Sequence, residues 1–336
     1  MRAALLRWYD AHKRALPWRE TRDPYAIWVS EIMLQQTRVE TVIPYWTRFL
    51  ERFPTTHDLA AADEDDVLSM WSGLGYYRRA RLLHAGVKEV VARYGGAVPE
   101  DAEARRGLPG VGRYTAGAIG SIAFDRAEPI VDGNVARVLT RVHGIDTPLG
   151  RGDTERRLWA ESERLVAGPR PGDLNQALME LGARVCTPKS PRCDACPVAA
   201  CVARDEGRQR ELPVPRPKKA PKAVRLSAVV ATRGGRVALT KRDGALFGGL
   251  WGVPTAEGDG RDAARAALRE AGVKARLSRD PAAEVEHVLT HRRLGVRVWR
   301  ATAAAPSSDG ARLFSEDELS EVGVSTLTRK ILDASR

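Results

Sequence analysis

Four cysteines within sixteen residues constrain this chain more than any other feature of its sequence. Cys186, Cys193, Cys196 and Cys201 are the only cysteines among the 336 residues. A disulfide framework spreads its cysteines through a small secreted chain, whereas thiols this close together can converge on one metal centre. Four thiolates suit either tetrahedral zinc or a [4Fe–4S] cluster, and the spacing C-x6-C-x2-C-x4-C by itself leaves both open.

The length predicts two domains, one of them large enough for a substantial core. Apolar residues make up 43% and charged residues 29%, as in an ordinary soluble protein, and no apolar run is long enough to span a membrane. Residues 1–18 lack the apolar centre of a signal peptide, because Asp10, His12, Lys13 and Arg14 interrupt them. We therefore expect a cytoplasmic, reducing compartment, in which the cysteines are ligands and not bridges.

The formal net charge of the chain is +11. Lysine and arginine neutralise phosphates, so this excess is typical of a protein whose partner is nucleic acid. Arginine far outnumbers lysine and alanine is abundant, which also fits a biased genome composition. The charge favours DNA or RNA as the partner and leaves the compositional explanation open.

Residues 1–202 are predicted to form a bundle of short helices joined by tight turns. Apolar residues recur at helical spacing over 24–53, 65–77 and 79–94, and proline and glycine interrupt the pattern often. From Leu226 the pattern changes to alternating or β-branched runs over 226–232, 236–241, 285–289 and 294–299, with one amphipathic helix over 262–271. Residues 225–336 are therefore predicted to form an α+β domain.

Residues 203–224 are predicted to link the two domains. Between Arg204 and Arg225 the chain has eight basic residues, three acidic residues and four prolines. A segment of this composition cannot bury a core, so we expect it to be extended. A solvated spacer and a segment that lies along DNA phosphates fit this composition equally well.

Residues 108–112, Leu-Pro-Gly-Val-Gly, enter a predicted helix over 114–124 that is rich in small side chains. Two glycines two positions apart let the backbone turn sharply, and the N-terminus of the following helix suits a phosphate. A lone G-x-G is usually only a turn. The longer run entering a helix is typical of a helix–hairpin–helix that holds a DNA backbone without reading bases.

Two carboxylates differ from their surroundings. Asp132 precedes a predicted helix over 135–142, and a carboxylate that caps a helix is kept ionised by its N–H groups and dipole. Glu31 shares an apolar helical stripe with Ile27 and Trp28, where burial would raise its pKa. One protonated and one charged carboxylate is the pairing that glycosidic-bond cleavage uses. The alternatives are a plain cap for Asp132 and an exposed helix face for Glu31, although the apolar neighbours argue against the second.

The hairpin, the downstream aspartate and the four-cysteine loop together resemble the helix–hairpin–helix DNA glycosylase superfamily, of the endonuclease III type. Three further runs resemble its adenine DNA glycosylase (MutY-type) family, over residues 29–37 (VSEIMLQQT), 73–77 (GLGYY) and 175–182 (NQALMELG). The similarity covers nearly the whole chain. It implies a monomeric, nucleoid-associated base-excision-repair enzyme that removes adenine mispaired with 8-oxoguanine or guanine in double-stranded DNA.

The resemblance also implies roles for individual residues. Glu31 would protonate the adenine ring and then help to activate water, while Asp132 would stabilise or capture the positive sugar and Asn134 would orient Asp132. The target adenine would first be flipped out of the duplex. Gln36 and Tyr76 would fill the duplex beside the lesion, and Gln176 would lie in the base pocket. The other residues implied to contact DNA are Trp18, Arg19, Leu108, Gly110, Val111, Gly112, Leu289, Thr290 and His291.

Tyr114 separates two reaction types. Endonuclease III-type lyases carry a lysine there, whose amine forms a Schiff base with the sugar and cuts the strand, and a phenol cannot do this. We therefore expect a monofunctional glycosylase that leaves an abasic site. The alternatives are a thymine glycosylase acting on T·G mismatches, which also has tyrosine there, and a non-catalytic lesion-binding protein. Glu31 and the C-terminal domain argue against the first, and the presence of both carboxylates argues against the second.

The same resemblance favours a [4Fe–4S] cluster over zinc for the four cysteines. The loop departs from the family in its last spacing, which has four intervening residues where five are usual, so it must close more tightly or Cys201 must approach from another angle. The cluster would be structural and electrostatic, orienting Arg184, Lys189 and Arg192 toward phosphate.

The C-terminal domain resembles the MutT-like (Nudix) domain of this family through residues 249–254. Its catalytic box is missing, because only residues 269–273 remain of it, without the paired glutamates that hold magnesium. Nucleotide hydrolysis is therefore not expected. The family recognises 8-oxoguanine through a Phe-Ser-His turn, which is matched here by Leu289, Thr290 and His291. The threonine keeps the hydroxyl, whereas the leucine lacks the aromatic face for stacking.

Overall fold

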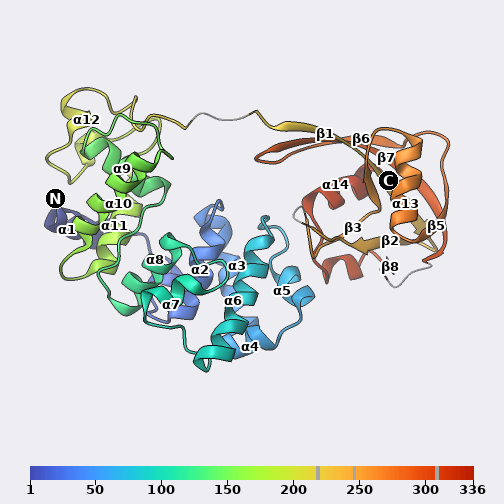
Figure 1. Cartoon of the computed structure of the whole chain (residues 1–336), viewed down its shortest axis with the longest axis horizontal. Coiled ribbons are helices and arrows are strands. Elements are labelled where there is room, and N and C mark those ends of the chain that lie inside the picture. The colour runs from blue at the N-terminus through green and yellow to red at the C-terminus, as the bar shows by residue number, and fades with distance from the viewer. Residues whose placement is uncertain (217–219, 245–246, 307–309) are drawn as a thin grey trace. The chain divides into compact units, whose positions relative to one another are not determined.

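The structure, a computed structural model, describes residues 1–216, 220–244, 247–306 and 310–336 (Figure 1). The chain divides into two compact units, of which the first comprises Met1–Ala60 and Ala85–Pro217 and the second comprises Ala61–His84 and Lys218–Arg336. Residues 61–84 thus come from the N-terminal part of the chain but pack with the C-terminal part. The predicted domain ranges 1–202, 203–224 and 225–336 stay a prediction.

The first unit is helical, as the sequence predicts. The helix α11 packs against α1, α8 and α9 and so forms the centre of the unit. None of the helices in the described ranges has the length and apolar composition that crossing a membrane requires. The helices, together with the 3-10 turns η1 and η2, are α1 (Arg2–His12), η1 (Pro17–Arg19), α2 (Pro24–Leu34), α3 (Val39–Arg52), α4 (Thr56–Ala61), α6 (Arg78–Tyr94), α7 (Ala102–Gly107), α8 (Arg113–Phe124), α9 (Gly133–Val142), α10 (Gly152–Val166), α11 (Pro171–Arg184), η2 (Cys193–Ala195) and α12 (Val202–Asp205). The start of α6, up to His84, belongs to the second unit.

The helical periodicity over residues 24–53 does not correspond to one helix. Asp23 caps α2 by accepting hydrogen bonds from the N–H groups of Tyr25 and Ala26, and the helix ends at Leu34. Gln36 then takes a left-handed φ of 57°, which a helix does not tolerate, and α3 starts three residues later. The two helices pack against each other, with α2 buried along nearly its whole length and α3 burying Val42 and Phe49.

The expectation that the segment from Arg204 to Arg225 cannot bury a core does not hold at Leu212, which is 2% exposed. The carbonyl of Leu212 accepts a hydrogen bond from Arg141 Nε over 2.9 Å, and that of Val214 accepts one from the Leu149 N–H over 3.2 Å. These contacts fasten the first part of the predicted linker to the first unit, because buried backbone groups need partners.

The second unit is built on a mixed sheet in which β1 and β7 pair in parallel and the other neighbours are antiparallel. The strand order is β3-β2-β1-β7-β5, with β4 also on β1, β6 also on β7 and β8 also on β2. The elements of this unit are α5 (Glu64–Met70), β1 (Lys222–Arg233), β2 (Arg236–Lys241), β3 (Trp251–Gly252), β4 (Thr255–Glu257), α13 (Arg261–Glu270), β5 (Val273–Leu277), β6 (Ala283–Val288), β7 (Arg292–Pro306), β8 (Ala311–Phe314), η3 (Glu318–Ser320) and α14 (Thr326–Ala334).

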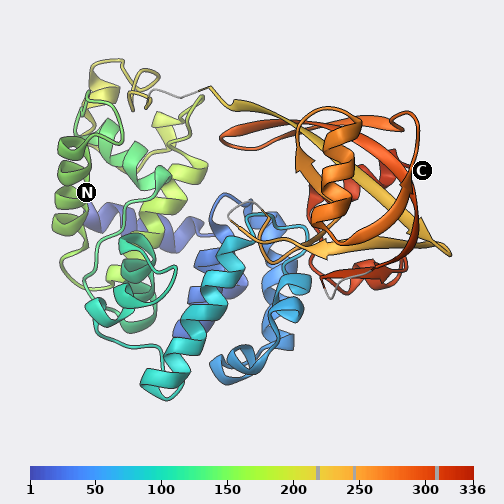
Figure 2. The ribbon, with the colours of Figure 1, turned by 45° about the vertical axis from the view of Figure 1, so that its right-hand side comes forward.

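Alternation along β1 gives the sheet two apolar faces. Ala228 and Val230 belong to a cluster that includes Leu327 and Ile331 of α14. Val229 and Ala231 belong to another cluster, which includes Ala264, Ala267 and Leu268 of α13. Figure 2 shows α13 lying across the strands. The α+β architecture predicted for the C-terminal part is therefore confirmed, with one helix on each face.

Candidate active site

A cleft of about 770 Å³ opens in the first unit where α2, α8, α11 and the start of α9 meet. Concave sites with a few convergent polar groups are where ligands bind. Ten of the residues that the sequence predicts to act on DNA line this cleft: Trp18, Arg19, Glu31, Gln36, Gly110, Gly112, Tyr114, Asp132, Asn134 and Gln176.

Glu31 lies within α2 on the apolar face predicted from its neighbours, and only 5% of its surface is exposed. Burial raises the pKa of the Glu31 carboxyl to about 7, and the charge of Asp132 raises it further. The hydrogen bond from Tyr114 and the charge of Arg19 oppose this increase. A carboxyl with a pKa near neutrality can give and take a proton at physiological pH, which suits a general acid.

Tyr114 lies in the first turn of α8, and its hydroxyl donates a hydrogen bond to Glu31 Oε2 over 2.7 Å. The same hydroxyl lies 3.3 Å from Met179 Sδ on α11. Burial raises the pKa of the Tyr114 phenol well above its ordinary value, so the side chain stays neutral and remains a donor. The structure thus places a neutral phenol, bonded to a carboxyl, at the position where a lyase would carry an amine.

Asp132 is the N-cap of α9, as its place before that helix predicts. Its Oδ1 accepts a hydrogen bond from the Val135 N–H over 2.7 Å, and its Oδ2 accepts one from Asn134 Nδ2 over 3.0 Å. These hydrogen bonds favour the ionised form, as predicted for a capping carboxylate. Burial raises the pKa of Asp132 and outweighs both hydrogen bonds and the nearby charge of Arg137. The cap therefore lessens the cost of charging Asp132 without removing it.

Arg137 joins the cap to the four-cysteine loop. Its Nη2 donates to Asn134 Oδ1 over 2.9 Å and to the carbonyl of Gly182 over 2.7 Å, while its Nε donates to the carbonyl of Cys186 over 2.8 Å. A chain of hydrogen bonds therefore runs from Asp132 through Asn134 and Arg137 to the first cysteine. Sequence reasoning missed Arg137, although its position three residues after Asn134 puts both on one helix face.

Glu180 was also missed, and it forms the buried centre of an ion-pair cluster in the cleft wall. Its Oε1 accepts from Arg14 Nε over 2.7 Å and its Oε2 accepts from Arg19 Nη2 over 2.8 Å. Burial raises the pKa of Glu180, but the hydrogen bonds from these two guanidinium groups outweigh it and hold the pKa at about 2. Glu180 therefore stays ionised and fixes Arg19 at the cleft. The sequence signal that could have identified Glu180 is a carboxylate among the apolar residues of α11.

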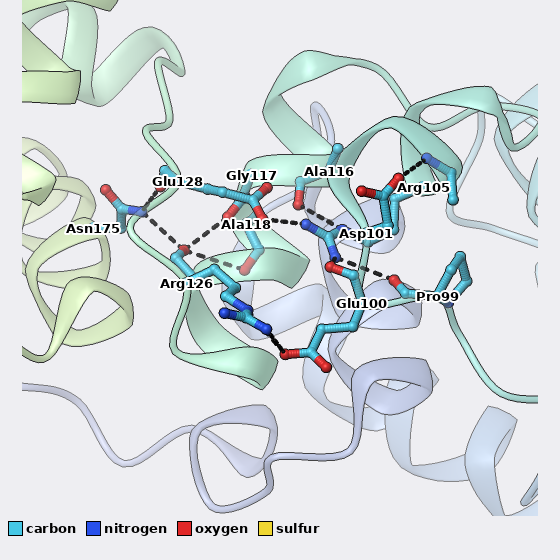
Figure 3. Close-up of polar contacts among 12 residues, drawn as sticks. Pro99, Glu100, Asp101, Arg105, Ala116, Gly117, Ala118, Arg126, Glu128 and Asn175 are labelled. Atoms are coloured by element: carbon cyan, nitrogen blue, oxygen red, sulfur yellow. Dashed lines mark hydrogen bonds and ion pairs between the residues drawn. The ribbon is translucent and has the colours of Figure 1, made fainter.

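The segment that leads to Asp132 is fixed by Arg105 of α7, whose side chain is fully buried. Figure 3 shows its polar contacts. Its Nε donates to the carbonyl of Ala116 on α8 over 3.2 Å, its Nη1 donates to the carbonyl of Pro99 over 3.1 Å, and its Nη2 pairs with Glu128. Asn175 of α11 donates to the carbonyl of Glu128 over 2.9 Å. These contacts tie both helices of the predicted hairpin to the residues just before the cap.

The predicted DNA-holding hairpin joins α7 to α8. Gly110 has a φ of +76°, which a side chain would disfavour, and Gly112 is the N-cap of α8. Leu108 and Val111 are buried, so their side chains anchor the turn to the core. Their predicted contact with DNA would therefore be made by the backbone of the hairpin, as in phosphate sites at helix N-termini.

Two residues implied to enter the duplex share an unusual backbone. Gln36, in the first unit, and Tyr76, in the second, both have left-handed φ angles, of 57° and 49°. Gln36 is exposed, and 51% of the surface of Tyr76 is exposed. Non-glycine residues in this conformation are uncommon and gather at functional sites.

The residues predicted to recognise 8-oxoguanine lie in the turn between β6 and β7, in the second unit. Thr290 and His291 are exposed, and Thr290 Oγ1 lies 3.2 Å from the hydroxyl of Tyr76. Leu289 instead packs against the apolar cluster beneath the sheet. The second unit thus brings Tyr76 and Thr290 together and turns the leucine toward the core.

All four cysteines line one pocket of the first unit. Arg141 lines the same pocket, and its Nη1 lies 3.2 Å from Cys186 Sγ, which suits a thiolate that carries negative charge. Across the described residues, no three Cys, His, Asp or Glu side chains are arranged as ligands of a single metal ion. Four sulfurs around one pocket nevertheless form the donor set of an iron–sulfur cluster, and these residues fit that group.

Comparison with protein families agrees with this arrangement. Residues 29–164 match the HhH-GPD superfamily base excision DNA repair protein, and residues 227–334 match the NUDIX domain. Residues 186–200 match the iron-sulfur binding domain of endonuclease III and so contain three of the four cysteines. The predicted fold class and the iron–sulfur loop are therefore confirmed.

Individual relatives extend the similarity to most of the chain. The adenine DNA glycosylase of Rattus norvegicus is 40% identical over 395 residues, covering 98% of this chain and 77% of the relative. The adenine DNA glycosylase of Homo sapiens is 51% identical over 221 residues, covering 63% of this chain and 40% of the relative.

Two solved structures resemble the helical part. A thermostable thymine-DNA glycosylase matches with a TM-score of 0.55 at 31% identity, over 61% of this chain and 94% of that one. A trapped endonuclease III–DNA covalent intermediate matches with a TM-score of 0.50 at 24% identity, over 62% of this chain and 97% of that one. At that identity the second match shows the fold alone.

Proposed function

The chain belongs to the adenine DNA glycosylase family, and we propose that the adenine it removes lies opposite 8-oxoguanine or guanine in duplex DNA. The enzyme is a base-excision-repair N-glycosylase. The observation that supports the proposed mechanism most strongly is the environment of Glu31, a buried carboxyl with a pKa of about 7 at the wall of a cleft large enough for a flipped base.

The first step is proton transfer from Glu31. The proton passes to a ring nitrogen of adenine, the glycosidic bond breaks, and its electron pair leaves with the base, so that neutral adenine departs. Tyr114, which bonds Glu31 over 2.7 Å, keeps the carboxyl in a fixed orientation for this transfer.

The departing base leaves a positively charged sugar, which Asp132 stabilises as an anion or captures covalently. Asn134 and the Val135 N–H hold both oxygens of this carboxylate, so it need not reorganise as the sugar gains charge. Glu31, now a carboxylate, takes a proton from water, and the resulting hydroxide adds to the sugar. This step regenerates the acid and leaves an abasic site.

The reaction stops at the abasic site because the position of the lyase nucleophile is occupied by Tyr114. A phenol with a raised pKa has no amine to form a Schiff base with the sugar. The proposed enzyme is therefore monofunctional and leaves the strand intact until alkali or another enzyme cuts it.

Recognition of 8-oxoguanine is assigned to the second unit. Tyr76, Thr290 and His291 supply exposed polar groups there, and the hydroxyls of the first two are 3.2 Å apart. Leu289 packs in the core and does not stack on the base, so 8-oxoguanine is recognised through hydrogen bonds.

The iron–sulfur group at the four cysteines is proposed to be [4Fe–4S], with zinc as the alternative. When bound, it supplies a fixed charge and crosslinks the loop whose first carbonyl accepts from Arg137. Analysis of fresh protein for iron and acid-labile sulfide tests the assignment, and stoichiometric zinc without iron would contradict it.

The function is tested with a duplex that carries adenine opposite 8-oxoguanine, treated with alkali after incubation. The wild-type chain should yield cleavage at the adenine only after alkali. Glu31→Gln should lose base release and keep most of its duplex affinity, because affinity depends on phosphate contacts.

Matched duplexes separate the alternatives. A thymine glycosylase would cleave a T·G duplex and leave the adenine duplex intact, and a lesion-binding protein would bind without cleaving either. Base release by Glu31→Gln near the wild-type rate would remove Glu31 from the role of acid.

A further inference from the structure

The hydroxyl of Tyr114 has one hydrogen but two acceptors within reach. Glu31 Oε2 is 2.7 Å away on α2, and Met179 Sδ is 3.3 Å away on α11. Met179 also lines the cleft. A thioether sulfur is a weak acceptor with no proton to donate, so it can only receive the phenol hydrogen.

The two acceptors suit the two states of the acid. When Glu31 is a carboxylate, the phenol hydrogen points to Oε2, since charged acceptors form the stronger hydrogen bonds. When Oε2 carries a proton, that proton can be donated to the phenol oxygen, and the phenol hydrogen must then turn elsewhere. The thioether of Met179 lies where this hydrogen would turn.

We propose that Met179 is a positioning residue whose thioether accepts the phenol hydrogen of Tyr114 while Glu31 carries its proton. The hydrogen returns to Oε2 when Glu31 gives its proton up, so the phenol keeps a partner in both states. This inference rests on the proposed function, in which Glu31 is the acid. It follows that Met179 stabilises the protonated acid and extends activity to higher pH.

The charged groups that face Glu31 do not change in this exchange. Asp132 at the start of α9 raises the pKa of Glu31, and Arg19 of η1 lowers it. Glu180, the neighbour of Met179 on α11, is held ionised by Arg14 and Arg19. Met179→Leu keeps a side chain of similar volume and alters no charge, so it removes only the acceptor.

The test follows the titration of Glu31 in the full chain by ¹³C NMR of glutamate carboxyls, with its signal assigned by its absence from Glu31→Gln. We expect Met179→Leu to lower the midpoint by about half a pH unit, as the loss of one weak hydrogen bond implies. The alkaline limb of the rate of base release should move by the same amount. Met70→Leu is the matched control, because Met70 ends α5 in the second unit and does not line the cleft, and its midpoint should equal that of the wild type.

A double-mutant cycle with Tyr114→Phe shows whether Met179 acts through the phenol. Without the hydroxyl, adding Met179→Leu should leave the Glu31 midpoint where Tyr114→Phe puts it. An unchanged midpoint in the single variant overturns the proposal, and so does an equal decrease in the Tyr114→Phe background, which would indicate packing. Met179→Ile provides a second apolar variant if the leucine variant folds poorly.

The same titration distinguishes the two proposals. Base release by Glu31→Gln would remove the proposed mechanism but leave the measured midpoints as they are. A Glu31 midpoint that is insensitive to Met179, with Glu31→Gln inactive, would remove only the positioning role.

Discussion

Burial raises the pKa of both Glu31 and Asp132, but the two carboxyls have different hydrogen-bond partners. Glu31 accepts one hydrogen bond, from Tyr114, whereas Asp132 is bonded through both oxygens at a helix N-terminus. The negative charge of Asp132 is itself a cause of the raised pKa of Glu31. Hydrogen bonding, and not burial, therefore distinguishes the proposed acid Glu31 from the proposed anion Asp132.

The raised pKa of Glu31 makes the stability of the folded state depend on pH. The pKa of Glu31 increases from 4.5 to about 7 on folding, so the folded state binds this proton more tightly than the unfolded chain does. Stability from this group is fully present below about pH 4.5 and is lost as the pH rises toward 7. Glu31→Gln should therefore increase the free energy of unfolding at pH 8 relative to the wild type, by up to about 3 kcal/mol, and much less at pH 5.

Urea unfolding of both chains at pH 5, 7 and 8 measures this difference. Glu163→Gln, which changes an exposed glutamate on α10, should follow the wild type at every pH. Parallel curves for Glu31→Gln and the wild type would show that the carboxyl is not buried as the structure has it.

Sequence reasoning identified these carboxyls because each leaves a local signal. Glu31 interrupts an apolar stripe, and Asp132 precedes a helix at capping distance. It did not reveal that burial opposes the cap at Asp132, because burial is a tertiary property. It also missed Arg137 and Glu180, whose partners lie 49 residues away at Cys186 and 166 residues away at Arg14.

The helices α7 and α8 owe their relative position to one buried guanidinium. Arg105 reaches the backbone of α8 and the side chain of Glu128, and the chain passes α8 so closely that a Cβ on Gly117 would lie 2.3 Å from the carbonyl oxygen of Pro129. Such contact leaves no space for adjustment. The capping aspartate follows three residues after that proline, so the packing of the hairpin fixes the position of the cap.

Arg105→Met should lower the free energy of unfolding by about 3 kcal/mol, because it removes one partner of a buried ion pair and takes the guanidinium donor from Glu128 and from the carbonyls of Pro99, Glu100 and Ala116. Arg126→Met is the matched control, since Arg126 and its partner Glu100 are both more than half exposed, and it should cost under about 1 kcal/mol. Urea unfolding at neutral pH measures both. Equal costs for the two variants would contradict the structural role of Arg105.

The elements themselves were largely predictable, and the exceptions have physical reasons. The predicted helix over 79–94 and the predicted strand over 294–299 lie within α6 and β7, and the predicted strand over 285–289 matches β6 up to Val288, because local periodicity decides them. The break after Leu34 was not predicted, because the apolar spacing continues across it. The predicted helix over 65–77 ends at Met70, since Gly73, Gly75 and Tyr76 all have left-handed φ angles.

Residues 61–84 belong to the second unit through contacts that no sequence pattern predicts. The Tyr77 hydroxyl donates to the carbonyl of Val324 over 3.1 Å, and Lys241 Nζ lies 2.8 Å from Asp65 Oδ1. A Cβ on Gly323 would lie 2.9 Å from Leu68 Cβ, so the two segments touch closely. Periodicity predicts only that 61–84 is helical and buries a face, not which distant segment covers that face.

A chain that ends at Pro217 should therefore lose protection in residues 64–84. Leu68 and Tyr77 would be uncovered, and backbone amides there should exchange hydrogen faster, whereas α9 and α11 in the first unit should keep their protection. Hydrogen exchange followed by mass spectrometry of both chains measures this. Unchanged exchange over 64–84 in the truncated chain would show that these contacts contribute nothing to its stability.

The same division has a consequence during synthesis on the ribosome. Residues 61–84 emerge from the exit tunnel early, but the strands and helices that cover them are translated from residue 218 onward. At roughly 5 to 20 residues per second, the nascent segment waits on the order of ten seconds with its apolar face uncovered. Chaperones that shield nascent chains therefore have time to bind this segment before its partners are made.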